Sequence, residues 1–187
     1  MNDVYSFSCF GDYASKGIAD AIKNFAPEDK SATVLCIGSD LILGDSLGPL
    51  VGTMLKKRGV LSYVYGSLTH PVTAKEILYA KNYVKKTHPN SFIIAIDAAI
   101  GEKNDVGIIK VNRGGLKPGL GVDKNLGKIG DVSIIGIVAP RSVQNYSLFN
   151  ATRLNLVYTM SERIANGLDE FLRSANPFSQ KQGAFAI

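Results

Sequence analysis

The chain has few of the residues that build covalent or metal frameworks, since its 187 residues include only two cysteines and two histidines. Cys9 and Cys36 are too few for a disulfide framework, and Cys36 falls in a predicted strand, where a reduced thiol behaves as a small core hydrophobe. A closed zinc site of Cys and His ligands would need all four residues together, which their spacing does not indicate. No histidine follows His88, so a site that draws its base or ligand from a late histidine is excluded.

Long apolar stretches are also absent. None reaches the roughly 18–20 residues that a helix needs to cross a bilayer. The N-terminus lacks a basic region followed by an apolar core, so we expect no signal peptide. The sequence therefore predicts a protein with no membrane partner and a cytoplasmic location.

Positive charge is in modest excess, with a net charge of +5 that favours acidic partners. The doublets Lys56-Lys57 and Lys85-Lys86 fall near predicted helix ends, where lysines complement the helix dipole. No basic run is interleaved with exposed aromatic residues, which argues against nucleic-acid binding. The sequence gives no indication of the oligomeric state.

Hydrophobic periodicity predicts an α/β fold in one domain over residues 1–187, with an N-terminal helical extension at 1–30 and a flexible tail at 176–187. Three strands separated by two helices in the first hundred residues predict a parallel sheet with right-handed crossovers. Asp12 is a candidate cap for the first helix. A glycine-rich segment at 113–130 is expected to be a loop over the sheet edge or the site. The predicted strands are 33–37, 60–65, 92–96, 106–111 and 131–138, and the predicted helices are 13–25, 46–58, 74–84 and 148–172.

Two aspartates stand after the strands that we expect at the centre of the sheet. Asp45 begins the helix after strand 33–37, and Asp97 ends strand 92–96. Ligands gather outside the carboxyl ends of strands where strand order reverses, so these carboxylates are expected to converge. Two close carboxylates hold a cation or share a proton, with one pKa raised. The alternative is structural: Asp45 caps its helix and Asp97 ties down a loop.

His70 and Glu76 are weaker candidates for the same site. Both lie between the two aspartates in the sequence, on the loop and helix after strand 60–65. His70 precedes a proline and is biased toward an extended conformation, from which it could face the site as a ligand or base. A surface histidine and a solvated helical glutamate are the alternatives.

Ser46 carries a competing signal, because Gly44-Asp45-Ser46-Leu47-Gly48 fits the Gly-x-Ser-x-Gly elbow of serine hydrolases. The same residues spell the Gly-Asp-Ser-Leu signature of an esterase family. Serine chemistry needs a histidine base within hydrogen-bond reach, and that family takes it from near the C-terminus. This chain has no histidine there, which argues against a serine esterase.

Short blocks distributed over most of the chain match a known family. They are residues 36–40, 44–53, 65–68, 71–72, 95–98, 116–119, 130–134 and 152–157. These blocks resemble the spore protease YyaC family of spore-forming bacteria, which is similar in turn to the germination protease and to the hydrogenase maturation endopeptidases. The resemblance implies a three-layer α/β sandwich with a mostly parallel central sheet, of the phosphorylase/hydrolase-like kind found in the hydrogenase maturation endopeptidases.

The resemblance also implies site residues. Asp45 and Asp97 match the two aspartates implicated in the germination protease. The hydrogenase endopeptidases hold a metal with a Glu, an Asp and a His; the Glu falls at Ser46 here, the Asp at Asp97, and the late His has no counterpart. The three-ligand set is therefore not carried over, although Asp45 and Asp97 together could ligate a divalent metal ion.

The expected function is hydrolysis of peptide bonds by this aspartate pair, as an endopeptidase of spore formation or germination. Its expected location is the cytoplasm of the forespore or the spore core, and its expected substrate is a protein such as the small acidic spore proteins. Two alternatives remain open: a non-catalytic sporulation protein that retains the fold as a binding module, and a serine esterase that uses Ser46.

Overall fold

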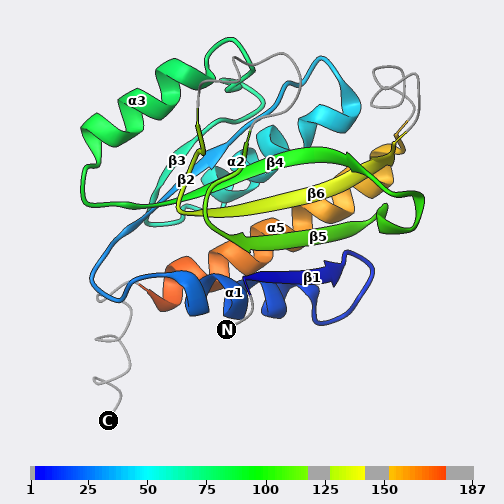
Figure 1. Cartoon of the computed structure of the whole chain (residues 1–187), viewed down its shortest axis with the longest axis horizontal. Helices are drawn as coiled ribbons and strands as arrows, with labels where there is room; N and C mark the ends of the chain where they lie inside the picture. The colour runs from blue at the N-terminus through cyan, green and yellow to red at the C-terminus, as the bar shows by residue number, and fades with distance from the viewer. Residues whose placement is uncertain (1–2, 118–126, 142–151, 176–187) are drawn as a thin grey trace.

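The computed structural model describes residues 3–117, 127–141 and 152–175. Six strands form one mixed sheet in the order β1-β5-β6-β4-β2-β3 (Figure 1). The pairs β2–β3, β2–β4 and β4–β6 are parallel, and β1–β5 and β5–β6 are antiparallel. The strands are β1 (Val4–Ser8), β2 (Ala32–Cys36), β3 (Tyr63–Tyr65), β4 (Phe92–Gly101), β5 (Ile108–Arg113) and β6 (Val132–Pro140).

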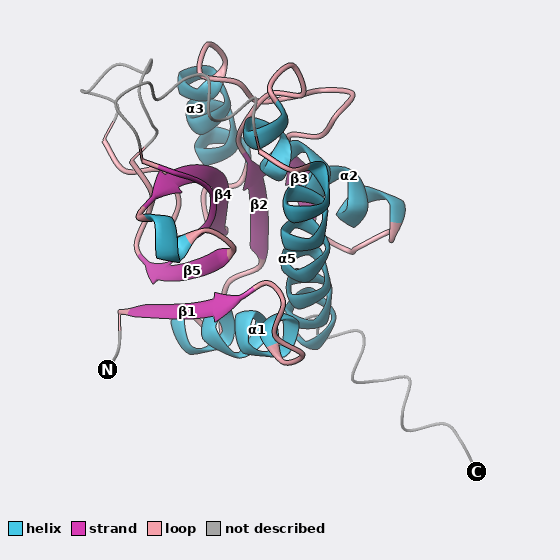
Figure 2. Ribbon diagram, turned by 90° about the vertical axis from the view of Figure 1, so that its right-hand side faces the viewer, coloured by secondary structure: helices cyan, strands magenta, loops and turns pink. Residues whose placement is uncertain are grey.

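The described helices cover both faces of this sheet, as Figure 2 shows, with α3 on one side of β2 and β4 and with α2 and α5 on the other. Helices lie on both faces because β2 and β4 bury apolar side chains on both faces of the sheet. Val34 and Ile94 belong to the core cluster shared with α1, α2 and α5, whereas Leu35 and Ile93 belong to the one shared with α3. The helices are α1 (Ala14–Phe25), α2 (Leu47–Lys57), α3 (Ile77–Thr87) and α5 (Leu154–Ser174), and short 3-10 turns are η1 (Leu43–Ser46) and η2 (Lys103–Asp105).

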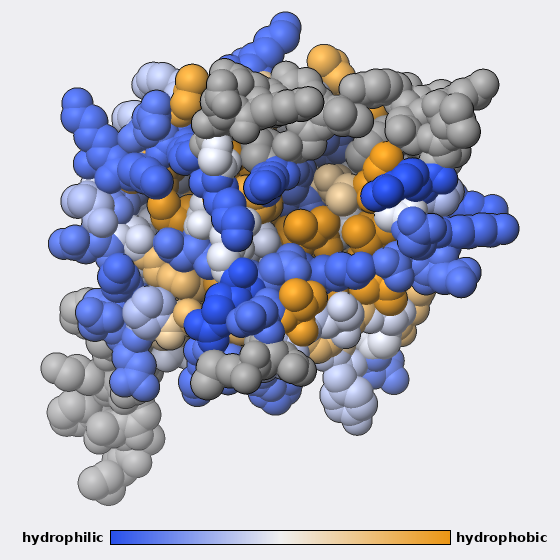
Figure 3. Space-filling view, in the orientation of Figure 1, coloured by the Kyte–Doolittle hydropathy of each residue, from blue (hydrophilic) through white to orange (hydrophobic). Residues whose placement is uncertain are grey.

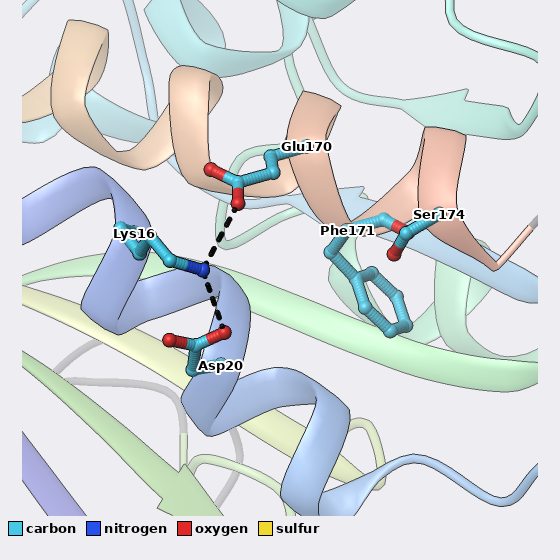
Figure 4. A network of polar contacts seen from close by, with 5 residues as sticks. All are labelled: Lys16, Asp20, Glu170, Phe171 and Ser174. Carbon is cyan, nitrogen blue, oxygen red and sulfur yellow. Dashed lines mark hydrogen bonds and ion pairs between the residues drawn. The ribbon is translucent and has the colours of Figure 1, made fainter.

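The N-terminal segment belongs to the same core. Ile18 and Ile22 of α1 are fully buried against the sheet cluster, and α1 packs along α5 where Gly167 lies beside Ser15 and Ile18. Figure 4 shows Lys16 of α1 between Asp20 and Glu170, at 3.3 and 3.5 Å. These exposed ion pairs contribute little, so the packing of apolar side chains holds α1 in place.

Several boundaries differ from the sequence-based prediction. The cap at Asp12 is wrong, because the N-cap position of α1 is Tyr13 and no side chain caps that end. Strand β1 was not predicted, and β4 continues four residues beyond Asp97. No described helix is long and apolar enough to cross a bilayer. The tail at 176–187 and residues 118–126 of the glycine-rich segment lie outside the described residues.

Candidate functional site

The order of the strands reverses around β2. From β2 the chain passes through α2 to β3 on one side, and then through α3 to β4 on the other side of β2. Asp45 follows β2 in η1, and Asp97 lies on β4, which pairs with β2 through Cys36 and Ile96. The expected adjacency of the two strands, β2 and β4, is therefore confirmed. This reversal is the place where open α/β sheets bind ligands.

Close backbone packing fixes the position of Asp45. Gly38 has φ +136°, and a Cβ there would lie 2.0 Å from the carbonyl oxygen of Asp45. A Cβ on Gly48, in the first turn of α2, would lie 2.1 Å from the carbonyl oxygen of Ile37. The N–H of Ser39 donates to the carbonyl of Asp45 at 3.2 Å. Only glycine permits these approaches, so the loop and the start of α2 lie directly against the end of β2.

Asp97 is held by the sheet itself. Asp97 pairs with Ile135 of β6 in the parallel ladder. Its Oδ1 accepts a hydrogen bond from the N–H of Ala98 at 2.8 Å. The side chain is partly buried. Asp97 therefore has little freedom to move relative to β4.

The two carboxyl groups interact electrostatically. Burial, and next the charge of Asp45, raise the pKa of Asp97 to about 8, although the hydrogen bond from Ala98 opposes the shift. Burial also raises the pKa of Asp45, against the opposing effect of a hydrogen bond with the Ser39 backbone. A pKa of about 8 keeps Asp97 protonated near neutral pH, beside the charge of Asp45 that contributes to the shift. This is the protonation state in which one carboxyl group can accept a proton while the other donates one.

Ser46 is adjacent to Asp45 but is not presented as a nucleophile. Its side chain is 5% exposed, and its hydroxyl donates to the carbonyl oxygen of Leu43 at 2.6 Å. Of the two histidines, His88 is hydrogen-bonded through Nε2 to the hydroxyl of Tyr65, and His70 Nδ1 lies 3.1 Å from Thr69 Oγ1. The hydrogen-bond arrangement of a Ser–His pair is thus not formed here.

His70 and Glu76 come together at a different place. Both line a cavity of about 480 Å³ between β3 and α3, which neither aspartate lines. The carboxylate of Glu76 accepts hydrogen bonds from the N–H and the hydroxyl of Thr73, which ties Glu76 to the turn before α3. The Thr73 hydroxyl is the main cause of the lowered pKa of Glu76. Glu76 thus has a structural task that the sequence-based interpretation did not assign.

The donor set limits the kinds of metal site. Among the residues that the structure describes, no three His, Cys, Asp or Glu side chains are grouped so that they could hold a metal ion. The pair offers two carboxylates, which suits a hard divalent cation such as Mg²⁺ with water as its remaining ligands. It does not suit a three-ligand centre that contains histidine.

Comparison with known proteins shows to which family the chain belongs. Residues 10–167 match the family described as "Protein of unknown function (DUF1256)", and the chain belongs to that family. One relative is the "Uncharacterized protein YyaC" of Bacillus subtilis (strain 168). It is 44% identical over 140 residues, which cover 74% of this chain and 68% of the relative. The predicted relationship to YyaC proteins is confirmed.

The sequence-based interpretation did not identify most of the residues that line the cavity between β3 and α3. Lys56, Tyr65, Tyr79 and Tyr83 line it together with His70 and Glu76. Two signals were present in the sequence. Tyr79 and Tyr83 are spaced i, i+4 on one helix, and residues 46–96 hold seven lysines and arginines but one carboxylate, that of Glu76.

Proposed function

We propose that this protein is an endopeptidase in which Asp45 and Asp97 activate water for attack on a peptide bond. The observation that carries the proposal is the pairing of β2 with β4, which places Asp97 beside the loop of Asp45, where burial and the charge of Asp45 raise the pKa of Asp97. The resemblance of these residues to the two aspartates of the germination protease supports it. The helices on both faces of the sheet are compatible with a three-layer sandwich of the hydrogenase maturation endopeptidase type, which we propose as the finer fold assignment.

The two carboxyl groups would divide the chemistry between them. Asp45, ionised, takes a proton from a water molecule whose oxygen attacks the carbonyl carbon of the peptide. Asp97 gives its proton to the carbonyl oxygen, so the tetrahedral intermediate is neutral. The C–N bond then breaks as Asp45 returns its proton to the leaving amine and Asp97 recovers the proton of the hydroxyl. A divalent cation held by both carboxylates would supply water activation in its own right.

The substrate that we propose is an acidic protein, such as a small acidic spore protein, in the cytoplasm of the forespore or the spore core. The net charge of +5 supports an acidic substrate. The test incubates the purified protein with such proteins, with and without Mg²⁺ or Mn²⁺, and follows the fragments by mass spectrometry. We expect cleavage by the wild type and loss of cleavage in Asp45→Asn and in Asp97→Asn.

Asp40→Asn is the matched control. Asp40 is exposed on the same loop as Asp45, and the substitution is chemically the same. It should leave cleavage unchanged. Intact substrate under all conditions, for the wild type as well as the variants, would instead indicate a binding protein that retains the fold.

A further inference from the structure

The cavity between β3 and α3 combines three features that the aspartate pair does not explain: aromatic walls, a surplus of positive charge and a direct connection to the loop that carries Asp45. Its volume is about 480 Å³, enough for a large side chain of a ligand. Tyr65 lies on β3, Tyr79 and Tyr83 lie on α3, and Lys56 comes from α2. The cavity is thus built by three elements at one edge of the sheet.

The tyrosines form a partly exposed cluster. The rings of Tyr79 and Tyr83 are stacked with centroids 5.9 Å apart, and Tyr65 meets Tyr83 edge-on at 6.0 Å. Tyr79 is 71% exposed. Tyrosine gives a large contact area at a small cost in side-chain entropy, which is why it is common in recognition surfaces.

The elements around this cluster carry several lysines. Lys56 lines the cavity. Residues 75–87, which form α3 and the turn before it, hold four lysines, of which Lys75, Lys85 and Lys86 are exposed. Glu76 is the single carboxylate in that range, and it is hydrogen-bonded to Thr73. Figure 3 shows that the face over α3 is mainly hydrophilic. A ligand with carboxylates would meet a favourable potential here and an aromatic pocket beneath it.

The wall of the cavity is joined to the aspartate loop. Val72, which lines the cavity, accepts a hydrogen bond through its carbonyl from the N–H of Gly38 at 3.0 Å. Val72 also pairs with Ile37 in a parallel bridge. Gly38 in turn lies against Asp45. A chain bound in the cavity would therefore lie one strand away from the aspartate pair.

We propose that this cavity is a docking site for an acidic segment of a protein substrate, which packs an aromatic side chain against the cluster of Tyr65, Tyr79 and Tyr83. The proposal rests on the proposed peptidase function for the identity of its partner as a protein. Lys56 and the exposed lysines of residues 75–87 attract the segment's carboxylates, and the tyrosine rings hold its aromatic side chain. Docking next to Gly38 positions the following residues at Asp45 and Asp97.

The test measures binding of fluorescent polymers by anisotropy. The probes are a glutamate-rich random Glu–Tyr copolymer, poly-glutamate, and oligo-dT as a single-stranded nucleic acid. The Glu–Tyr copolymer should bind at least about fivefold more tightly than poly-glutamate. Binding should weaken at about 0.5 M salt, where charge interactions are screened.

Matched variants locate the binding. Tyr79→Ala and Lys56→Gln should each weaken copolymer binding by about fivefold or more. Tyr158→Ala, an exposed tyrosine of α5, and Lys23→Gln, an exposed lysine of α1, should not change it. Asp97→Asn should bind the copolymer normally, because it removes only the proposed chemistry.

The outcomes separate the two proposals. Tighter binding of oligo-dT, no binding of the copolymer, or binding that Tyr79→Ala leaves unchanged would each overturn the docking site. A wild type that binds the copolymer through Tyr79 but cleaves no acidic protein would overturn the peptidase and leave the docking site standing. Cleavage of acidic proteins that Tyr79→Ala leaves unaffected would overturn the docking site and leave the peptidase standing.

Discussion

Asp45 and Asp97, 52 positions apart in the chain, titrate as neighbours, because the charge of one raises the pKa of the other. Each residue is positioned by contacts of its own structural element. Asp45 is held by glycine contacts at the end of β2, whereas Asp97 is held by the β4 ladder. The pairing of β2 with β4 brings the two groups together, and it leads to the first two predictions.

Asp97→Asn should stabilise the protein at alkaline pH. The folded state holds a proton on Asp97 up to about pH 8, whereas an unfolded Asp loses it near pH 4. Stability should therefore be full below about pH 4 and fall as the pH rises toward 8. At pH 8 the variant should be more stable than the wild type by about 5 kcal/mol, a difference absent at pH 4. Urea denaturation at both pH values measures it.

The same shift predicts an alkaline limit for the proposed cleavage. If Asp97 must donate a proton, kcat/KM for cleavage should fall above about pH 8, with the loss of one proton. Initial rates from pH 5 to 10 give the profile. A rate that keeps rising above pH 9 would contradict a protonated Asp97 as the acid.

Gly48→Ala should destabilise the fold strongly. Its Cβ would overlap the carbonyl oxygen of Ile37, so α2 would have to move away from β2, at an expected cost of about 2–4 kcal/mol. Gly59→Ala is the comparison, since nothing lies within 4 Å of a Cβ there and only the φ of +63° is unfavourable. Its expected cost is about 1–2 kcal/mol. Thermal unfolding of both variants checks the order.

Ser46→Ala should lower stability and leave peptide cleavage intact. The buried hydroxyl donates to Leu43, and losing such a bond costs about 1 kcal/mol. Loss of all hydrolysis with an unchanged fold, by circular dichroism, would revive Ser46 as a nucleophile. Hydrolysis of a small ester that depends on Ser46 but not on Asp97 would point the same way.

The sequence predicted the part of the fold that carries Asp45 and Asp97 well. The apolar run before Asp97 and the Gly38-to-Gly48 segment gave local signals of a buried strand and of a strand–loop–helix unit. The end of β4 was missed because the charged Asp97 interrupts the apolar run, although residues 98–101 continue the pairing with β6. Strand β1 was missed because Tyr5 and Phe7 alternate over only five residues.

The cavity could not be predicted in the same way. Tyr65 and Tyr79 lie on different elements, and only the packing of α3 against the sheet brings them together. His70 was associated with the aspartates by its place in the sequence. In the structure, His70 lines the cavity between β3 and α3, which neither aspartate lines.

Asp45 and Asp97 are anchored in different ways. Asp97 has its main chain paired in the sheet, whereas Asp45 lies in a single 3-10 turn, and its carbonyl accepts a hydrogen bond from Ser39 and lies against Gly38. The N–H of Gly38 also donates to Val72, which lines the cavity. A chain docked there as proposed would therefore be linked through one hydrogen bond to the loop that leads to Asp45, whereas Asp97 lies on the far side of β2.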